Sequence, residues 1–526
     1  MEIKQTNKER FVAYIRNSWT EFLFGIYLFL IFAAGIQVSS MPGKRNRQGD
    51  ISFEMLGLCV IVLLVPKIRK LVQKISFSPP ADVSIKQKWK VFGIAAGITF
   101  AVLLFWFAGC YPGSFSPDSI EQYEQAVSGN YDDWHPVWHT LLSFTLPLKL
   151  THWNAAIILF QIVSFSLITG YFAFTIYLYS GVLYAGIASA LILLSPFTLS
   201  IVMFPWKDTA FAMASCLCML YSIHIYFTKG EWCGKRWKII LFAFMLMNAT
   251  LLRHNGILFT FFLMAALFFF MPERKWFSLV AMTLLFIALI RFLLYPLLDV
   301  TKPGNRVTET SGLPLSVITY VAKAAPEKLD KKTLEFVKDM MKSQPDWKKF
   351  YSLSGFNSVK YRGVNFEAIE QVGFSGIWKM TFRCFRRAPE QSLRAAVGLT
   401  IPVYGLEVAS RTFGGIVKND AGLVQKGNKI IKSFGKKYTS LIFGTPLQYL
   451  FLHIGMTILA MIAFVLFKTD FKSPVDWKRI LFFIPIFAYD FGTMLFLTGP
   501  DNRFFYVNWF ICPLIILIFG RKTVCS

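Results

Sequence analysis

Apolar runs of about 20 residues recur along most of this chain and restrict it to one broad kind of fold. A helix of that length spans the hydrocarbon core of a bilayer, where every backbone polar group must be hydrogen-bonded internally. The sequence therefore predicts an all-α integral membrane protein with about 12 transmembrane helices. The predicted spans are 19–38, 51–68, 90–110, 153–179, 181–203, 209–227, 237–253, 255–271, 276–298, 441–467, 479–498 and 503–520.

The basic character of the chain is consistent with this topology. The formal net charge is +25, but many lysines and arginines lie in short loops between apolar runs, and no basic-aromatic nucleic-acid motif is present. Basic loops of this kind face the cytoplasm and attract anionic lipid, so membrane lipids, and not nucleic acid, are the expected partners. Loops 67–90 and 468–479 then place both termini in the cytoplasm of a multi-pass plasma-membrane protein.

The pattern divides the chain into four parts. They are an N-terminal two-helix membrane segment (1–89), a transmembrane core (90–298) with an acidic outer loop (111–152), a lid (299–440) and C-terminal transmembrane helices (441–526). The lid is predicted to be a large, mainly helical extracytoplasmic domain.

Two segments of the lid have amphipathic helical patterns, at 330–342 and at 376–387. The second alternates aromatic and basic residues and is predicted to lie on the membrane surface. Ser392–Val408 is moderately apolar, but Arg394, Pro402 and Glu407 argue against a span there.

Residues 114–139 of the acidic outer loop place five carboxylates and two histidines, His135 and His139, beside lipid, which is costly unless these groups bind or transform something. Ser116 is a good N-cap, Pro117 a good first residue and Gly129 a good terminator, so a helix is predicted over 117–128. The polar residues that share one face of it are Asp118, Glu121, Gln122 and Gln125. Asp118 lies in the first turn, where an ionised carboxylate is favoured and can accept a proton or bind a divalent cation.

Three further polar motifs fall on the same predicted side of the membrane as this loop. They are Pro205-Trp206-Lys207-Asp208, Arg253-His254-Asn255-Gly256 and Gly499-Pro500-Asp501-Asn502-Arg503. Polar loops without a common role would be shared between both faces. Their convergence predicts one outward-facing site under the 299–440 lid, with Asp132, Asp133 and His135 beside it.

Each motif also has a purely structural interpretation. Lys207 and Asp208 can form an interfacial ion pair with Asp208 as N-cap, Arg253 can extend toward a lipid headgroup, and Asp501 can pair with Arg503. The functional interpretation places a phosphate on Lys207 or Arg253, because the guanidinium fork matches phosphate oxygens.

The order of these motifs resembles that of the GT-C superfamily of polytopic glycosyltransferases, and more closely a bacterial family of GT-C-like membrane proteins. The resembling motifs, within residues 90–520, are Pro117-Asp118-Ser119, Asp133-Trp134-His135-Pro136, Trp206-Lys207-Asp208, Arg253-His254-Asn255-Gly256 and the loop before the last span. The acidic loop here follows the third predicted span instead of the first. The first two spans therefore resemble an N-terminal addition.

This resemblance implies inverting transfer of a sugar from a polyprenyl-phosphate-linked donor to a cell-envelope glycan, lipid or protein on the outer face of the membrane. Asp118 is the implied general base, with Asp208 and His135 as further catalytic candidates. The candidate substrate-binding residues are Glu121, Asp133, Lys207, Arg253, His254, Asn255, Asp501 and Arg503. Some GT-C enzymes use a divalent cation such as Mg²⁺ or Mn²⁺, for which the candidate ligands are Asp118, Glu121, Asp132, Asp133 and Asp208.

Two other classes of function remain open. A transporter or flippase of a lipid-linked glycan would carry buried charges in mid-span and two related halves. Asp490 lies inside an apolar run and is expected to face the bundle interior with a partner, but matching halves are not evident. A non-catalytic envelope scaffold would leave the clustered acids unexplained.

Overall fold

The computed structural model describes residues 7–39, 47–80, 84–302, 304, 306–353, 355–406 and 414–521. Within these ranges the chain is helical, with only isolated β-bridges between extended segments. The predicted all-α class is therefore confirmed. Six helices in the described part are long and apolar enough to cross a membrane, or seven if one bent pair forms a single span.

These six helices coincide with six of the predicted spans. They are Ser18–Ile36 in α1 (Asn7–Ser39), α3 (Ile85–Cys110), α7 (Ala156–Ser180), α10 (Lys207–Phe227), Glu273–Leu297 in α13 (Glu273–Ala288) and its continuation to α14 (Tyr295–Leu297), and Asn502–Gly520, which ends in α27 (Asn508–Gly520). The bent pair, Asp476–Phe482 and Ile484–Phe496 (α26), covers the predicted span 479–498.

Of the other predicted spans, 51–68 and 237–253 each correspond to one continuous helix, whereas 181–203, 255–271 and 441–467 differ from the structure. The segment 181–203 is two helices, α8 (Val182–Leu193) and α9 (Pro196–Ile201), because Ser195 caps the second and Pro196 fills its first turn. The segment 441–467 is broken between α22 (Lys429–Phe443), α23 (Gln448–Phe451) and α24 (Ile454–Lys468). Three helices cover the remaining predicted spans: α2 (Arg47–Lys74) covers 51–68, α11 (Arg236–Leu251) covers most of 237–253, and α12 (Gly256–Leu267) covers most of 255–271. Of these apolar segments, α8, α12 and α24 are shorter than a full span.

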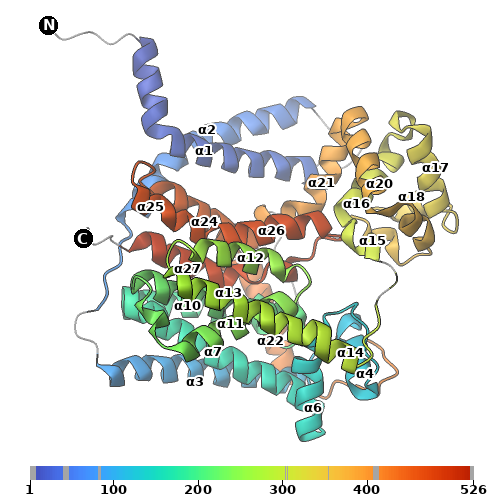
Figure 1. Ribbon diagram of the computed structural model, residues 1–526. Helices are drawn as coiled ribbons and strands as arrows, with labels where there is room; N and C mark the ends of the chain where they lie inside the picture. The colour runs from blue at the N-terminus through green and yellow to red at the C-terminus, as the bar shows by residue number, and fades with distance from the viewer. Residues whose placement is uncertain are drawn as a thin grey trace.

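The long helices lie side by side and run across the view in Figure 1, so the bundle has two opposite ends. We call the end that carries α4 (Pro117–Ser128) the site end. The opposite end carries α25 (Pro474–Lys478) and the end of α27. One large apolar core, which includes Phe165, Phe211 and Phe510, runs through the bundle. It holds the connecting turns of the helices in fixed positions at the site end.

Residues 306–404 form a helical unit with a hydrophobic core of its own, around Leu315, Phe356 and Ile369. Its helices are α15 (Arg306–Thr310), α16 (Gly312–Ala324), α17 (Lys331–Met340), α18 (Trp347–Phe350), α19 (Asn357–Lys360), α20 (Phe366–Arg387) and α21 (Pro389–Tyr404). This unit lies beyond the ends of the long helices, on the right in Figure 1.

Both predicted amphipathic helices are present in this unit. Asp330 caps α17 by accepting a hydrogen bond from Thr333 N, as expected for the 330–342 pattern. The 376–387 pattern is the second half of α20, on which Phe382 is exposed. Pro389–Tyr404 packs on α16 and is not among the helices long enough to span a membrane. Glu407 and Val408 lie outside the described residues.

The end of the predicted lid follows a different path from its first part. Residues 414–428 run in extended form beside 108–115, with Phe115 N donating to Gly415 O and Asn428 N to Ala108 O. The following helix, α22, then packs against α3. The helical unit that lies near the site is therefore 306–404, and 414–443 supports the start of the acidic loop from the side.

Candidate functional site

The predicted helix of the acidic loop is present as α4, with Gly129 as its terminator at φ 79°. Ser116 begins the helix without capping it, because its hydroxyl accepts a hydrogen bond of 2.8 Å from Trp206 Nε1. This contact fixes the first turn of α4 against the start of α10. Asp118, one residue into that turn, has 35% of its side chain exposed and faces the other polar motifs.

Arg503 joins three of the four motifs. Its Nη2 donates to Asp118 Oδ2 at 2.8 Å, and its Nε lies 2.8 Å from Asp501 Oδ2 and 3.7 Å from Asp208 Oδ2. The guanidinium also lies over the ring of Trp206, at 4.7 Å. The pairing of Asp501 with Arg503 is confirmed, but it is one contact of a guanidinium that holds three carboxylates.

The third motif enters the cluster through Arg253. Arg253 forms an ion pair with Asp208, and the side chains are 8% and 2% exposed. Its guanidinium lies 4.4 Å from the ring centre of Phe504, and its Nε donates to Asn255 Oδ1 at 2.7 Å. Arg253 is therefore buried at the centre of the cluster, and the headgroup interpretation is wrong. Asp208 is also not the N-cap of α10, since Trp206 holds that position.

Lys207 has a different kind of partner. Its Nζ donates to Nδ1 of His135 at 2.9 Å. The opposite ring nitrogen of His135 faces Glu121 Oε2 at 3.5 Å, and 45% of the Glu121 side chain is exposed. Among the described residues no carboxylate forms an ion pair with Lys207, so this ammonium group is available to an anionic ligand.

The surroundings shift the pKa values of several titratable groups of the site, among them Asp118 and His135. Burial alone would raise the pKa of Asp118, but Arg503, His135 and Lys207 outweigh it and lower the pKa to about 2. Burial lowers the pKa of His135, and Lys207 lowers it further against the opposing effect of Glu121 and Asp118. At neutral pH the site therefore holds an ionised Asp118 and a neutral His135.

Asp132, Asp133 and His254 lie beside this cluster with partners of their own. Asp132 accepts a hydrogen bond from Gln125, and Asp133 pairs with Arg291 at 2.7 Å. His254 is exposed, 3.3 Å from the carbonyl of Trp134. Within the described residues, no group of three or more His, Cys, Asp or Glu side chains is arranged to hold a metal ion. The proposed metal ligands have separate partners instead: Asp118, Asp133 and Asp208 pair with arginines, Glu121 faces His135, and Asp132 accepts from Gln125.

The 306–404 unit contacts residues beside the cluster at two places. Asn357 N donates to Thr498 O at 2.8 Å, next to the Gly499–Arg503 motif. Lys360, which pairs with Glu309, lies 5.9 Å from the ring centre of Trp134 in the acidic loop. The unit is thus fixed to two of the four motifs.

Several residues of this region were not among the predicted site residues. Arg291 lies inside a predicted span, and a lone arginine in an apolar run was a signal for a buried partner. The fully buried His139 bonds to Gln122 at 2.7 Å, which directs that face of α4 inward and leaves Asp118 and Glu121 toward the site. Glu309 and Lys360 had no recognisable pattern, because their relevance depends on how the 306–404 unit folds.

Comparison with known proteins adds no assignment at this point. No protein-family model, curated protein or solved structure matches the chain. The functional argument therefore depends on the geometry of the cluster and on the order of its motifs.

Proposed function

We propose that this protein is a membrane glycosyltransferase of the GT-C type, which moves a sugar from a polyprenyl-phosphate-linked donor to a cell-envelope acceptor. The observation that carries the proposal is Lys207. It is a cation held by a neutral imidazole, without a carboxylate partner among the described residues, beside the partly exposed carboxylate of Asp118. In such a pair, Lys207 can bind a phosphate and Asp118 can accept the proton of an acceptor hydroxyl.

The proposed topology follows the basic loops. About 12 helices cross or enter the plasma membrane, both termini are cytoplasmic, and the site end with the 306–404 unit faces outward. Short helices such as α8 and α12 then enter the bundle without crossing it alone. The turn before α12 is anchored by the buried Arg253, and irregular backbone is tolerated at membrane depth where it is covered by protein.

The proposed reaction uses Asp118 as general base. The acceptor hydroxyl gives its proton to a carboxylate oxygen of Asp118 while the hydroxyl oxygen bonds to the anomeric carbon. The bond from that carbon to the carrier phosphate breaks, and its electron pair leaves with the phosphate. Attack on the face opposite the phosphate inverts the anomeric configuration. Lys207 and Arg503 stabilise the charge that builds on the leaving group.

The resting ion pair also explains how Asp118 can become a stronger base. While Arg503 holds it, Asp118 has a pKa of about 2 and accepts protons poorly. When a donor phosphate draws Arg503 away, Asp118 loses the cation that counteracts the effect of burial, so the pKa of Asp118 rises. Donor binding would then precede activation of the acceptor.

Two of the predicted catalytic residues have supporting roles in this scheme. Asp208 is buried between Arg253 and Arg503 and positions them. His135 positions Lys207 through its Nδ1. The reaction balances without a divalent cation, and two of the candidate ligands, Asp118 and Asp133, are each paired with an arginine.

The test compares cell-envelope glycans and lipid-linked sugars from cells that carry the wild-type protein, no protein, Asp118→Asn or Glu124→Gln. Glu124 is an exposed acid on the same helix and is the matched control. We expect Asp118→Asn to match the deletion, with loss of one sugar substituent and accumulation of its polyprenyl-phosphate donor, while Glu124→Gln matches the wild type. Wild-type glycans in the Asp118→Asn strain, with the variant protein present in the membrane, would exclude the role of Asp118.

A flippase is the second candidate, because it too would bind a lipid-linked phosphate. The two are separated by assaying detergent-solubilised protein with the extracted donor lipid and envelope acceptor. A glycosyltransferase forms product in micelles, whereas a flippase has no activity without a sealed membrane.

A further inference from the structure

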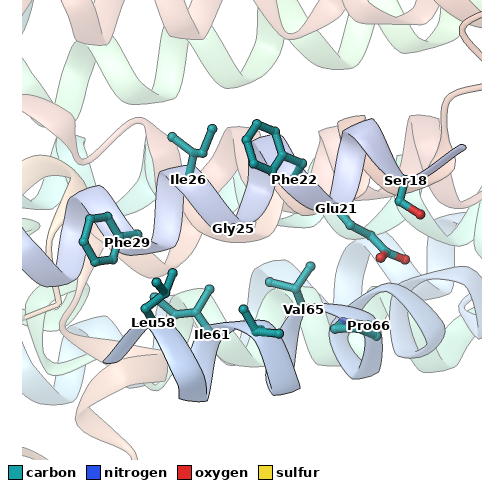
Figure 2. A pocket seen from close by; sticks show the side chains of 11 residues that line it. Ser18, Glu21, Phe22, Gly25, Ile26, Phe29, Leu58, Ile61, Val65 and Pro66 are labelled. Atoms are coloured by element: carbon teal, nitrogen blue, oxygen red, sulfur yellow. The ribbon is translucent and has the colours of Figure 1, made fainter. Parts of the chain in front are cut away.

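An apolar groove lies between α1 and α2, well away from the site. It encloses about 290 Å³, and its lining is apolar except at one end. Figure 2 shows Phe22, Ile26 and Phe29 on one helix and Leu58 and Ile61 on the other, with Gly25 opening the space between them. Ser18 and Glu21 provide the polar atoms at one end of the groove.

A second, polar pocket of about 500 Å³ lies at this same end of the two helices. Arg69, Lys468 and Lys472 contribute cationic groups to its lining. Two acids also line it: Asp476, which is paired with Arg479 at 2.7 Å, and Asp470, whose Oδ1 accepts a hydrogen bond from Lys472 N at 3.0 Å. The two spaces are joined by the ion pair between Glu21, which lines the groove, and Arg69, which lines the polar pocket, at 2.6 Å.

The length of the groove corresponds to one leaflet of a bilayer. Its lining on α1 runs from Ser18 to Phe29, a distance of about 16 Å at the α-helical rise of 1.5 Å per residue. Half of a hydrocarbon core is about 15 Å thick. The polar pocket is at the end of the bundle that carries α25, so the leaflet is the one opposite the site end.

We propose that the groove and the polar pocket together bind one anionic phospholipid of that leaflet. An acyl chain occupies the space beside Gly25, and the phosphate and headgroup lie against Arg69 and Lys468. The chemistry is complementary at both ends, since an apolar groove of leaflet depth ends beside a polar pocket whose lining includes Arg69, Lys468 and Lys472. The donor of the proposed reaction is excluded as the occupant, because its phosphate must reach the site end.

The test uses full-length purified protein and native mass spectrometry with dioleoyl-phosphatidylglycerol as the probe and dioleoyl-phosphatidylcholine as the zwitterionic comparison. Arg69→Gln removes the headgroup contact, and Lys70→Gln is its control, an exposed cation on the same helix outside both pockets. Gly25→Leu fills the groove while all charges remain. Its control is Gly93→Leu on α3, where an added Cβ has no neighbouring atom within 4 Å.

The expected result is tighter binding of phosphatidylglycerol than of phosphatidylcholine to the wild-type protein and both controls. Arg69→Gln and Gly25→Leu should each weaken phosphatidylglycerol binding about tenfold, the effect of losing one charge-assisted contact or the fit of one chain. Equal binding of the two lipids, or unchanged binding in Gly25→Leu, would overturn the proposal. A protein dimer that Gly25→Leu dissociates would overturn it too, since a second copy of the chain would then occupy the groove.

Discussion

Asp208 provides the sharpest test of how the polar cluster is held together. Its carboxylate is 2% exposed and lies between the guanidinium groups of Arg253 and Arg503. Asp208→Asn keeps the shape of the side chain but leaves the buried charge of Arg253 without its counter-ion. Breaking a buried ion pair from one side costs about 3–5 kcal/mol, because the remaining charge stays desolvated. We expect a loss of that size in the free energy of unfolding.

The matched control is Asp501→Asn. Asp501 contacts the same Arg503 at 2.8 Å, but its side chain is 43% exposed and water can replace it. Removing an exposed partner costs about 0–1 kcal/mol. The assay is unfolding of the purified protein in mixed micelles by increasing fractions of sodium dodecyl sulfate, followed by circular dichroism. Equal costs for the two variants would show that burial does not govern these pairs and would refute the reasoning.

A double variant separates the unpaired charge from general damage. In Asp208→Asn/Arg253→Gln no charge of the pair remains buried, so much of the stability lost in Asp208→Asn should return. The two single costs should therefore fail to add, with a coupling free energy of about 1–3 kcal/mol. Additive losses would mean that the two side chains stabilise the protein independently.

Three further outcomes follow from the same structure. Burial, and then Lys207 and His135, lower the pKa of His139 to about 3. The neutral form therefore stabilises the fold above pH 6.5, and this contribution is lost as the pH falls toward 3, with a slope of at most about 1.4 kcal/mol per pH unit. His139→Gln should flatten this dependence of the unfolding free energy on pH. Lys207→Gln should raise the KM for a polyprenyl-phosphate sugar about tenfold with the folded protein retained, measured by initial rates in micelles. In a cysteine-free background, Glu124→Cys should react with an impermeant thiol reagent from outside the cell and Lys472→Cys only after the membrane is opened, whereas position 208 is too buried to report.

The position of the site was largely predictable from local signals. Ser116-Pro117 and Gly129 fixed the ends of α4. The helical period placed Asp118, Glu121, Gln122 and Gln125 on one face, of which Gln122 and Gln125 are buried and Asp118 and Glu121 are partly exposed. The buried partner expected for Asp490 is Asn508, whose Nδ2 donates to it at 3.0 Å. Each of these inferences depends on residues near in sequence or on the cost of a polar group in lipid.

The choice of ion-pair partners was not predictable in this way. Asp208 lies beside Lys207 in sequence, yet helix geometry directs the two side chains apart, toward Arg253 and His135. Which cation reaches which acid depends on how α10, α11 and α27 pack, and no local pattern records that packing. The broken segment 181–203 is a different case, because Ser195-Pro196 already marked a new helix start within the apolar run.

The partners of each charge separate the residues that hold the site from those that can act on a ligand. Asp208 and Arg253 satisfy each other in the interior, and Asp133 is held by Arg291. Among the described residues, the carboxylate of Asp118 is partly exposed and held by an arginine that also serves two other acids, and the ammonium group of Lys207 is held by an imidazole, so both keep capacity for a ligand. Glu121, 45% exposed and 3.5 Å from His135, is a further carboxylate of this kind. A flippase needs charged groups along a path through the membrane, but Asp490 is bonded to Asn508 and Arg291 reaches the acidic loop. A carboxylate and a cation that remain available at a single end of the bundle favour a reaction at that surface over movement across it.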